Sequence, residues 1–201
     1  MCAQYNRKDP FYERAKEAGY RSRAAYKLLE INKKYKILKP GTKVIDLGSW
    51  PGGWLQVASE IVGESGLVVG IDLVELEPLD KGNTTAITGD ARDQSNIRMA
   101  LEIAGSRFDA VLSDMSPKLS GIPETDQAGT VACAELALEV AGQVLKERGD
   151  LIIKVFKGSD TDQFVRRLKP KFAAINRAEL DSTRATSNEY YLIAKGFKDG
   201  K

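Results

Sequence analysis

The chain has 201 residues, 42% apolar and 29% charged, so it can bury a core without disulfides or metals. No apolar run approaches the roughly 18 to 20 residues that a membrane span needs, and the N-terminus lacks the apolar core of a signal peptide. The absence of histidine excludes Ser-His-Asp catalysis and histidine-based zinc sites. Any general base must be Asp, Glu, Lys, Tyr or Cys. The distant Cys2 and Cys133 are expected to be free thiols in a reducing cytoplasm.

The net charge is only +2, but it is unevenly distributed. Residues 1–43 carry 12 Lys/Arg and 4 Asp/Glu, whereas the remainder carries 18 and 24. This asymmetry indicates that the basic N-terminal end faces a polyanion. The alternative interpretation is a solvated helical face.

The first predicted elements are helices. Residues 9–19 form a short helix that ends at Gly19, and Ser22 caps a second helix that Lys39-Pro40 stops. Strands and helices then alternate. Strands are expected at 43–47, 67–71, 84–88, 108–113, 149–156, 172–179 and 189–196, and helices at 53–62, 93–104, 126–147 and 160–169.

This alternation predicts an α/β fold with a mostly parallel seven-stranded sheet that helices cover on both faces. The last two strands have no helix between them, so they are expected to form an antiparallel hairpin at the sheet edge. That ending is typical of Rossmann-like methyltransferases. We expect one domain over residues 1–201, in which residues 1–40 form a basic helical extension.

A glycine-rich turn follows the first predicted strand, in Asp46-Leu-Gly-Ser-Trp-Pro-Gly-Gly-Trp54. Strand, glycine-rich turn and helix together present free backbone N–H groups to a nucleotide-like ligand. Asp72 ends the next strand, where it is placed to accept hydrogen bonds from a ribose diol. The turn lacks GxGxxG and the GKS/T of a P-loop, so it suits a nucleoside better than a pyrophosphate. The predicted cofactor is S-adenosylmethionine.

Acidic residues recur at the ends of the predicted strands, where doubly wound sheets bind their ligands. Asp46, Asp72, Asp90 and Asp114 come at or just after four successive strands. Taken singly, each is more simply interpreted as a turn or capping residue; four together indicate a site.

Lys154 lies within the predicted strand Asp150-Leu-Ile-Ile-Lys-Val-Phe156. A buried lysine requires carboxylate partners, and Asp114 and Glu189 are the candidates. Burial disfavours its charged form and carboxylates favour it, so the sequence leaves open whether Lys154 is a general base or an orienting ammonium. The alternative is a lysine whose head reaches water.

Six segments resemble the RrmJ/FtsJ-type ribosomal RNA ribose 2′-O-methyltransferases. Together they run from about Gly19 to Phe197: Arg21-Ser-Arg-Ala-Ala-Tyr-Lys-Leu28, Asp46 to Trp54, Gly89-Asp90, Ser113-Asp-Met-Ser-Pro117, Ile153-Lys-Val-Phe156 and Ser187-Asn-Glu-Tyr-Tyr191. The resemblance implies a catalytic tetrad of Lys27, Asp114, Lys154 and Glu189. It implies cofactor contacts from Gly52, Trp54, Asp72, Asp90 and Asp114. No metal is expected, because this chemistry requires none and the sequence contains no plausible metal-ligand cluster.

The resemblance also implies that the substrate is a uridine in large-subunit ribosomal RNA, methylated in the assembled ribosomal subunit. We further expect a monomer without membrane or DNA partners. RNA binding is further favoured by basic residues near the C-terminal end, namely Arg166, Arg167, Lys169, Lys171, Arg177 and Arg184. The sequence departs from the family pattern at Trp50, usually a small residue, at Leu55, often Ser or Thr, and at Lys118, frequently Asn. The first two are expected to reshape the methionine side of the pocket.

Three other functions remain open. The nearest is ribose methylation of a tRNA anticodon loop by the same family. A nicotinamide-dependent reductase is disfavoured by the missing GxGxxG and by the final hairpin. A non-catalytic RNA-binding or assembly factor is disfavoured by the intact tetrad.

Overall fold

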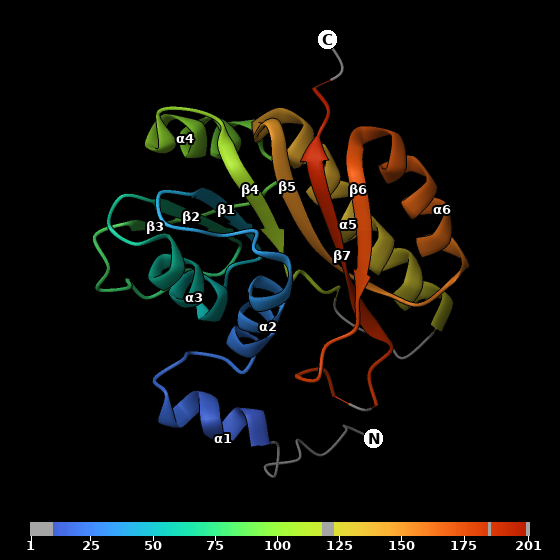
Figure 1. Cartoon of the computed structure of the whole chain (residues 1–201), viewed down its shortest axis with the longest axis horizontal. Helices are drawn as coiled ribbons and strands as arrows, with labels where there is room; N and C mark the ends of the chain where they lie inside the picture. Colours follow the sequence, from blue (N-terminus) through green and yellow to red (C-terminus); the bar gives the residue numbers. More distant parts are fainter. Residues whose placement is uncertain (1–9, 118–122, 185, 200–201) are drawn as a thin grey trace.

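The computed structural model describes residues 10–117, 123–184 and 186–199, built around a seven-stranded sheet (Figure 1). The strand order is β3-β2-β1-β4-β5-β7-β6. The strands are β1 (Lys43–Leu47), β2 (Leu67–Asp72), β3 (Thr84–Thr88), β4 (Phe108–Ser113), β5 (Leu145–Phe156), β6 (Phe172–Ala178) and β7 (Glu189–Phe197). The predicted α/β fold class is confirmed.

The first five strands pair in parallel, and β7 pairs antiparallel with both β5 and β6. The predicted terminal hairpin is therefore present. Its strand β7 lies between β5 and β6, and β6 forms the edge of the sheet. Strand order reverses between β1 and β4, which is where the ligands of such sheets bind.

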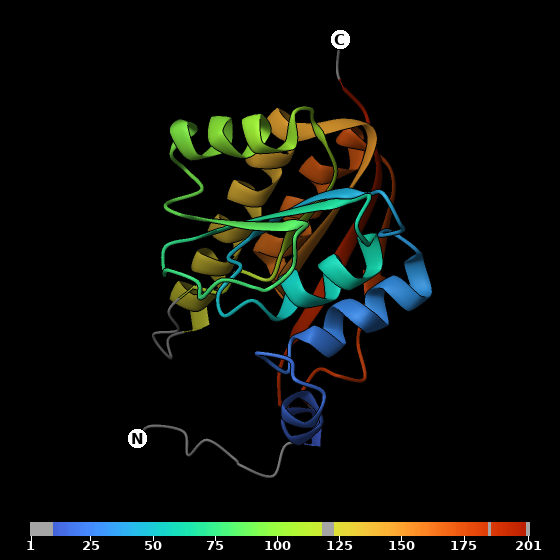
Figure 2. The same cartoon turned by 90° about the vertical axis from the view of Figure 1, so that its left-hand side faces the viewer.

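Helices cover both faces of the sheet, as Figures 1 and 2 show. The α2 and α3 helices pack on one face, and α4, α5 and α6 pack on the other. The short α1 lies against α2, where Phe11 packs 5.6 Å from Tyr26 between ring centroids. The helices are α1 (Pro10–Glu17), α2 (Ala25–Tyr35), α3 (Gly53–Val62), α4 (Gln94–Ala104), α5 (Pro123–Val144) and α6 (Ser159–Leu168), followed by the 3-10 turn η1 (Lys169–Lys171).

The largest differences from the predicted boundaries concern α2 and β5. The predicted cap at Ser22 is wrong: α2 begins after Ala24, which makes no side-chain capping bond, and it ends at Tyr35 because Lys36 turns into the left-handed region (φ 54°). Residues 145–147 were expected to be helical. They belong to β5 instead, because Leu145 pairs with Phe108 ahead of a bulge.

The carboxyl ends of the parallel strands lie toward the side of the molecule that carries α1 and α2 (Figure 1). Within the described residues, no helix combines the length and apolar character that a membrane span requires.

Candidate active site

Polar side chains form a row across four neighbouring strands, on the sheet face that α2 and α3 cover. Because side chains alternate along a strand, Asp46 of β1, Lys154 of β5 and Tyr191 of β7 lie on this face, and Asp114 directly follows β4. Lys154 and Tyr191 are direct partners across β5 and β7. The sheet therefore brings together residues that lie up to 145 positions apart in the sequence.

Lys154 and Asp114 form a largely buried ion pair. The Lys154 ammonium lies 3.1 Å from Asp114 Oδ1 and donates a 2.6 Å hydrogen bond to the Asp114 backbone carbonyl. The side chains are only 8% and 18% exposed. Two contacts to one residue fix the position of the lysine amine, which is what proton transfer or orientation of a nucleophile requires.

Lys27 and Glu189 form a second, separate pair. Lys27 reaches Glu189 from α2, and Thr183 donates a 3.2 Å hydrogen bond to the same carboxylate oxygen. The ion-pair partner of Glu189 is therefore Lys27, which corrects the expectation that Glu189 holds Lys154. The tetrad is arranged as two pairs.

Tyr191 connects the two pairs, and sequence reasoning did not select it. Its hydroxyl donates a 2.7 Å hydrogen bond to Asp114 Oδ1, and the Lys27 ammonium lies 5.7 Å from its ring centroid. Burial and the nearby Asp114 carboxylate raise the pKa of Tyr191 well above its ordinary value, so the phenol stays a neutral donor. Its sequence signals were its place at the end of the segment Ser187-Asn-Glu-Tyr-Tyr191 and its position two residues after Glu189, on the same strand face.

Replacing Tyr191 by phenylalanine should lower the turnover of this site by about tenfold or more, because a hydrogen bond to a charged group contributes about 1.5 to 3 kcal/mol. Turnover and cofactor affinity are to be measured together. Tyr190→Phe is the matched control, since Tyr190 is similarly buried but packs on the opposite face of the sheet. Equal turnover in the two variants would show that Tyr191 does not position Asp114.

An acidic cavity of about 710 Å³ opens at the carboxyl ends of β1, β2 and β4. This volume suits a nucleoside-sized ligand. Three of the four predicted aspartates line it: Asp72, Asp90 and Asp114. The wall also contains Gly48, Trp50, Ile71, Leu73, Gly89, Ala91, Arg92, Met115, Ser116, Ala132, Cys133 and Leu136.

Backbone and side-chain donors hold two of these carboxylates. Asp72 accepts hydrogen bonds from the backbone N–H groups of Trp50 and Val74, each at 2.8 Å. Asp90 accepts hydrogen bonds of 2.6 to 3.0 Å from the Arg92 guanidinium, and these bonds lower the pKa of Asp90. Both carboxylates are thus oriented as hydrogen-bond acceptors at the cavity wall.

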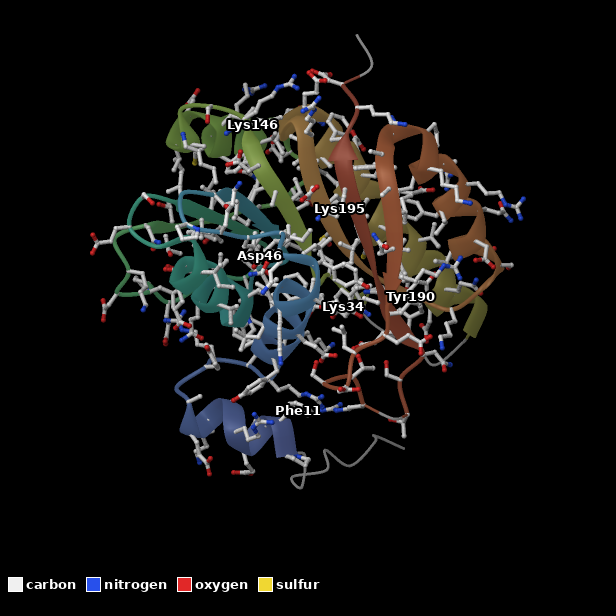
Figure 3. All side chains as sticks on the ribbon, viewed as in Figure 1. Phe11, Lys34, Asp46, Lys146, Tyr190 and Lys195 are labelled. Atoms are coloured by element: carbon white, nitrogen blue, oxygen red, sulfur yellow. The ribbon has the colours of Figure 1, made fainter. Side chains whose placement is uncertain are left out.

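Asp46, the fourth aspartate, is buried behind this wall near the middle of the molecule (Figure 3). Within the described residues, neither of its carboxylate oxygens has a hydrogen-bond partner, and the buried Ser49 hydroxyl has none either. Burial raises the pKa of Asp46 well above its ordinary value, and the charges of Asp114 and Asp72 raise it further. Unpaired buried polar atoms are costly, so this cluster suits a ligand that brings donors or positive charge.

Other residues named by the sequence lie outside the cavity lining. Trp54 is 3% exposed, its indole N–H donates to the Ala24 carbonyl at 2.8 Å, and its ring packs on Tyr191. Gly52 has a φ of 106° and faces Arg21. Leu55 is fully buried in the core, so it does not reshape the cavity wall. Lys118 lies outside the described residues.

A basic cavity of about 690 Å³ opens between α2, the end of β5 and the start of β7. Both Lys27 and Glu189 line it. Three further cationic residues do so as well: Arg23, Lys157 and Arg184. This excess of positive charge suits a phosphate-bearing ligand.

Two of the predicted basic residues near the C-terminal end are engaged in ion pairs. Arg167 pairs with Glu135, and Arg177 pairs with Asp162 at 2.8 Å. These exposed pairs contribute little to stability. Among the six basic residues singled out near the C-terminal end, Arg184 lines the basic cavity.

The two cavities meet at Ser116, which lines both. Asp114 belongs to the acidic cavity, and Lys27 and Glu189 belong to the basic cavity. The polar row therefore reaches the acidic cavity through Asp114, and the Lys27–Glu189 pair lines the adjoining cavity of opposite charge. Such an arrangement can bring a bound donor and a bound acceptor into line for group transfer.

Comparisons with known proteins agree with this geometry. The family described as FtsJ-like methyltransferase matches residues 20–197. A relative from Marinobacter nauticus named "Ribosomal RNA large subunit methyltransferase E" is 45% identical, over 94% of this chain and 91% of its own length. A relative of the same name from Methanothermobacter thermautotrophicus is 41% identical, over 96% of this chain and 91% of its own length.

Solved structures show the same architecture. A Plasmodium falciparum protein, provisionally named a ribosomal RNA methyltransferase, superposes with a TM-score of 0.79 at 29% identity, covering 89% of this chain and 98% of its own. The sequence match spans most of the chain, as does the structural match. The chain belongs to the FtsJ-like methyltransferase family.

Proposed function

We propose that this protein transfers a methyl group from S-adenosylmethionine to the 2′-hydroxyl of a ribose in large-subunit ribosomal RNA. The observation that carries the proposal is the largely buried Lys154–Asp114 pair, whose aspartate lines the acidic cavity two residues before Ser116, which lines both cavities. The names of the relatives support the ribosomal substrate. A uridine of the assembled subunit, methylated in the cytoplasm, is the specific target that we propose.

The residues of the acidic cavity fit S-adenosylmethionine. Asp72 would accept from the ribose diol and Asp90 from the adenine amino group, since both stand as oriented carboxylates. The unpaired oxygens of Asp46 and Ser49 suit a ligand that carries positive charge. Asp114 would complete the site beside the transferred methyl group. Contacts from Gly52 and Trp54 stay predictions, and a Gly52 contact would involve its backbone.

When bound, the cofactor supplies a methyl group that its positive sulfur already activates. The protein must align the ribose oxygen and manage one proton. Asp114 fixes the position of Lys154, and the Tyr191 hydroxyl holds the Asp114 carboxylate. The lysine amine can therefore orient or deprotonate the ribose hydroxyl. Alignment can contribute up to about 7 to 11 kcal/mol in well-oriented systems.

The basic cavity would hold the RNA. Arg23, Lys157 and Arg184, which line this cavity with Lys27, would contact phosphates near the target ribose. Such contacts carry little sequence information. We infer that the surface of the assembled ribosomal subunit supplies most of the specificity.

Incubating undermethylated large ribosomal subunits with labelled S-adenosylmethionine tests the proposal. We expect label in one ribose of the large-subunit RNA, identified by mass mapping, and a rate that falls steeply with salt. Label in a tRNA anticodon loop instead would favour the alternative substrate. Absence of label from both RNAs, with cofactor bound, would contradict the methyltransferase assignment and favour a non-catalytic binding protein.

A further inference from the structure

Trp50 exposes a large indole ring at the acidic cavity. Its side chain is 55% exposed, although tryptophan is mostly buried in folded proteins. It lines the cavity together with Leu73, which is 69% exposed. The neighbouring Val74 is 51% exposed, so three apolar side chains adjoin a polar ligand site.

The carboxylate of Asp72 holds this apolar group in place. Asp72 Oδ2 accepts the Trp50 backbone N–H and Asp72 Oδ1 accepts the Val74 backbone N–H, both at 2.8 Å. Leu73 lies between Asp72 and Val74 in the sequence. The apolar group is therefore tethered to the residue that would accept the cofactor's ribose.

The position of Trp50 favours the cofactor over RNA as its ligand. Among the described residues that line the two cavities, the acidic and basic cavities share Ser116 alone, and Trp50 lines only the acidic one. A flat adenine ring offers a face on which an indole can pack, and aromatic packing on a base is favourable for every base.

We propose that the Trp50 indole, with Leu73, covers the adenosine part of bound S-adenosylmethionine. This inference rests on the proposed function and adds a residue that neither the tetrad nor the aspartates include. The cover removes apolar surface of both partners from water and thereby tightens cofactor binding. It also shields the ribose contact at Asp72 from solvent.

Cofactor binding to variants of the full chain tests the cover. Calorimetry should show that Trp50→Ala weakens S-adenosylmethionine binding by about 5- to 150-fold, the range found for stacking of aromatic side chains on bases. Trp50→Phe should keep most of the affinity. Met99→Ala is the matched control, because Met99 is 47% exposed on α4 and lies outside the lining of the acidic cavity. This variant should bind S-adenosylmethionine as tightly as the wild type.

Fluorescence gives a readout that is independent of activity. The chain has two tryptophans, and the other, Trp54, is 3% exposed, so acrylamide should quench mainly Trp50. Saturating S-adenosylmethionine should reduce quenching of the wild type to the level of Trp50→Phe.

The possible outcomes separate the cover from the proposed function. Unchanged quenching at saturation, or unchanged affinity in Trp50→Ala, would overturn the cover while leaving the methyltransferase proposal intact. A wild type that binds no S-adenosylmethionine would overturn both.

Discussion

Replacing Lys154 by alanine should abolish methyl transfer while leaving cofactor binding within a few-fold of wild type. The Lys154 amine is fixed by Asp114, which lines the acidic cavity, whereas Lys154 itself is not part of that lining or of the basic cavity's. Proton transfer by a placed group typically contributes about 10² to 10⁴-fold, so turnover should fall by at least this range. Single-turnover methylation and calorimetric binding are the measurements.

Two controls separate a chemical role from a structural one. Thermal unfolding of Lys154→Ala shows whether loss of the ion pair destabilises the fold. Removing Lys154 leaves the largely buried Asp114 carboxylate without its positively charged partner. Lys154→Arg keeps a positive charge that does not deprotonate in proteins. Substantial activity in the arginine variant would identify Lys154 as an orienting cation. Wild-type turnover in Lys154→Ala would remove it from the mechanism.

Local sequence signals were strong enough to place most of the strands. The bounds of β1, β3 and β4 agree with prediction because each strand is a short run with glycine or charged residues close to both of its ends. The start of β5 was missed because it depends on pairing between Leu145 and Phe108, and the apolar pattern of α5 continues into it. The end of α2 was missed because Lys36 adopts a conformation more common for glycine or asparagine.

The sequence predicts a tetrad whose four residues the fold brings into two ion pairs, but it could not predict which residues pair. Lys27 comes from α2 and Glu189 opens β7, and which lysine meets which carboxylate depends on the packing of α2 over the sheet. Tyr191 and Trp54 show the same limit. Both are aromatic residues within recognisable segments, yet one donates to Asp114 and the other packs in the core. Only tertiary packing distinguishes them.

Burial at Asp46 has a consequence for stability that depends on pH. Burial, and then the charges of Asp114 and Asp72, raise the pKa of Asp46 well above its ordinary value. In the unfolded chain an aspartate has a pKa of about 3.9, so below that pH Asp46 carries its proton in both the folded and the unfolded chain. As pH rises above it, the unfolded chain loses its proton first. The stability that the protonated Asp46 provides is therefore lost as pH rises through the folded pKa.

Replacing Asp46 by asparagine removes this titration while keeping the shape of the side chain. We expect Asp46→Asn to match the wild type in thermal stability near pH 4 and to exceed it progressively toward pH 8. Cofactor affinity should fall at the same time, because an amide offers no negative charge to a cationic ligand. Asp150→Asn is the control for binding, since Asp150 accepts from Gly196 and lines a different cavity. A variant less stable than wild type at every pH would show that the Asp46 carboxylate has stabilising partners in the folded protein.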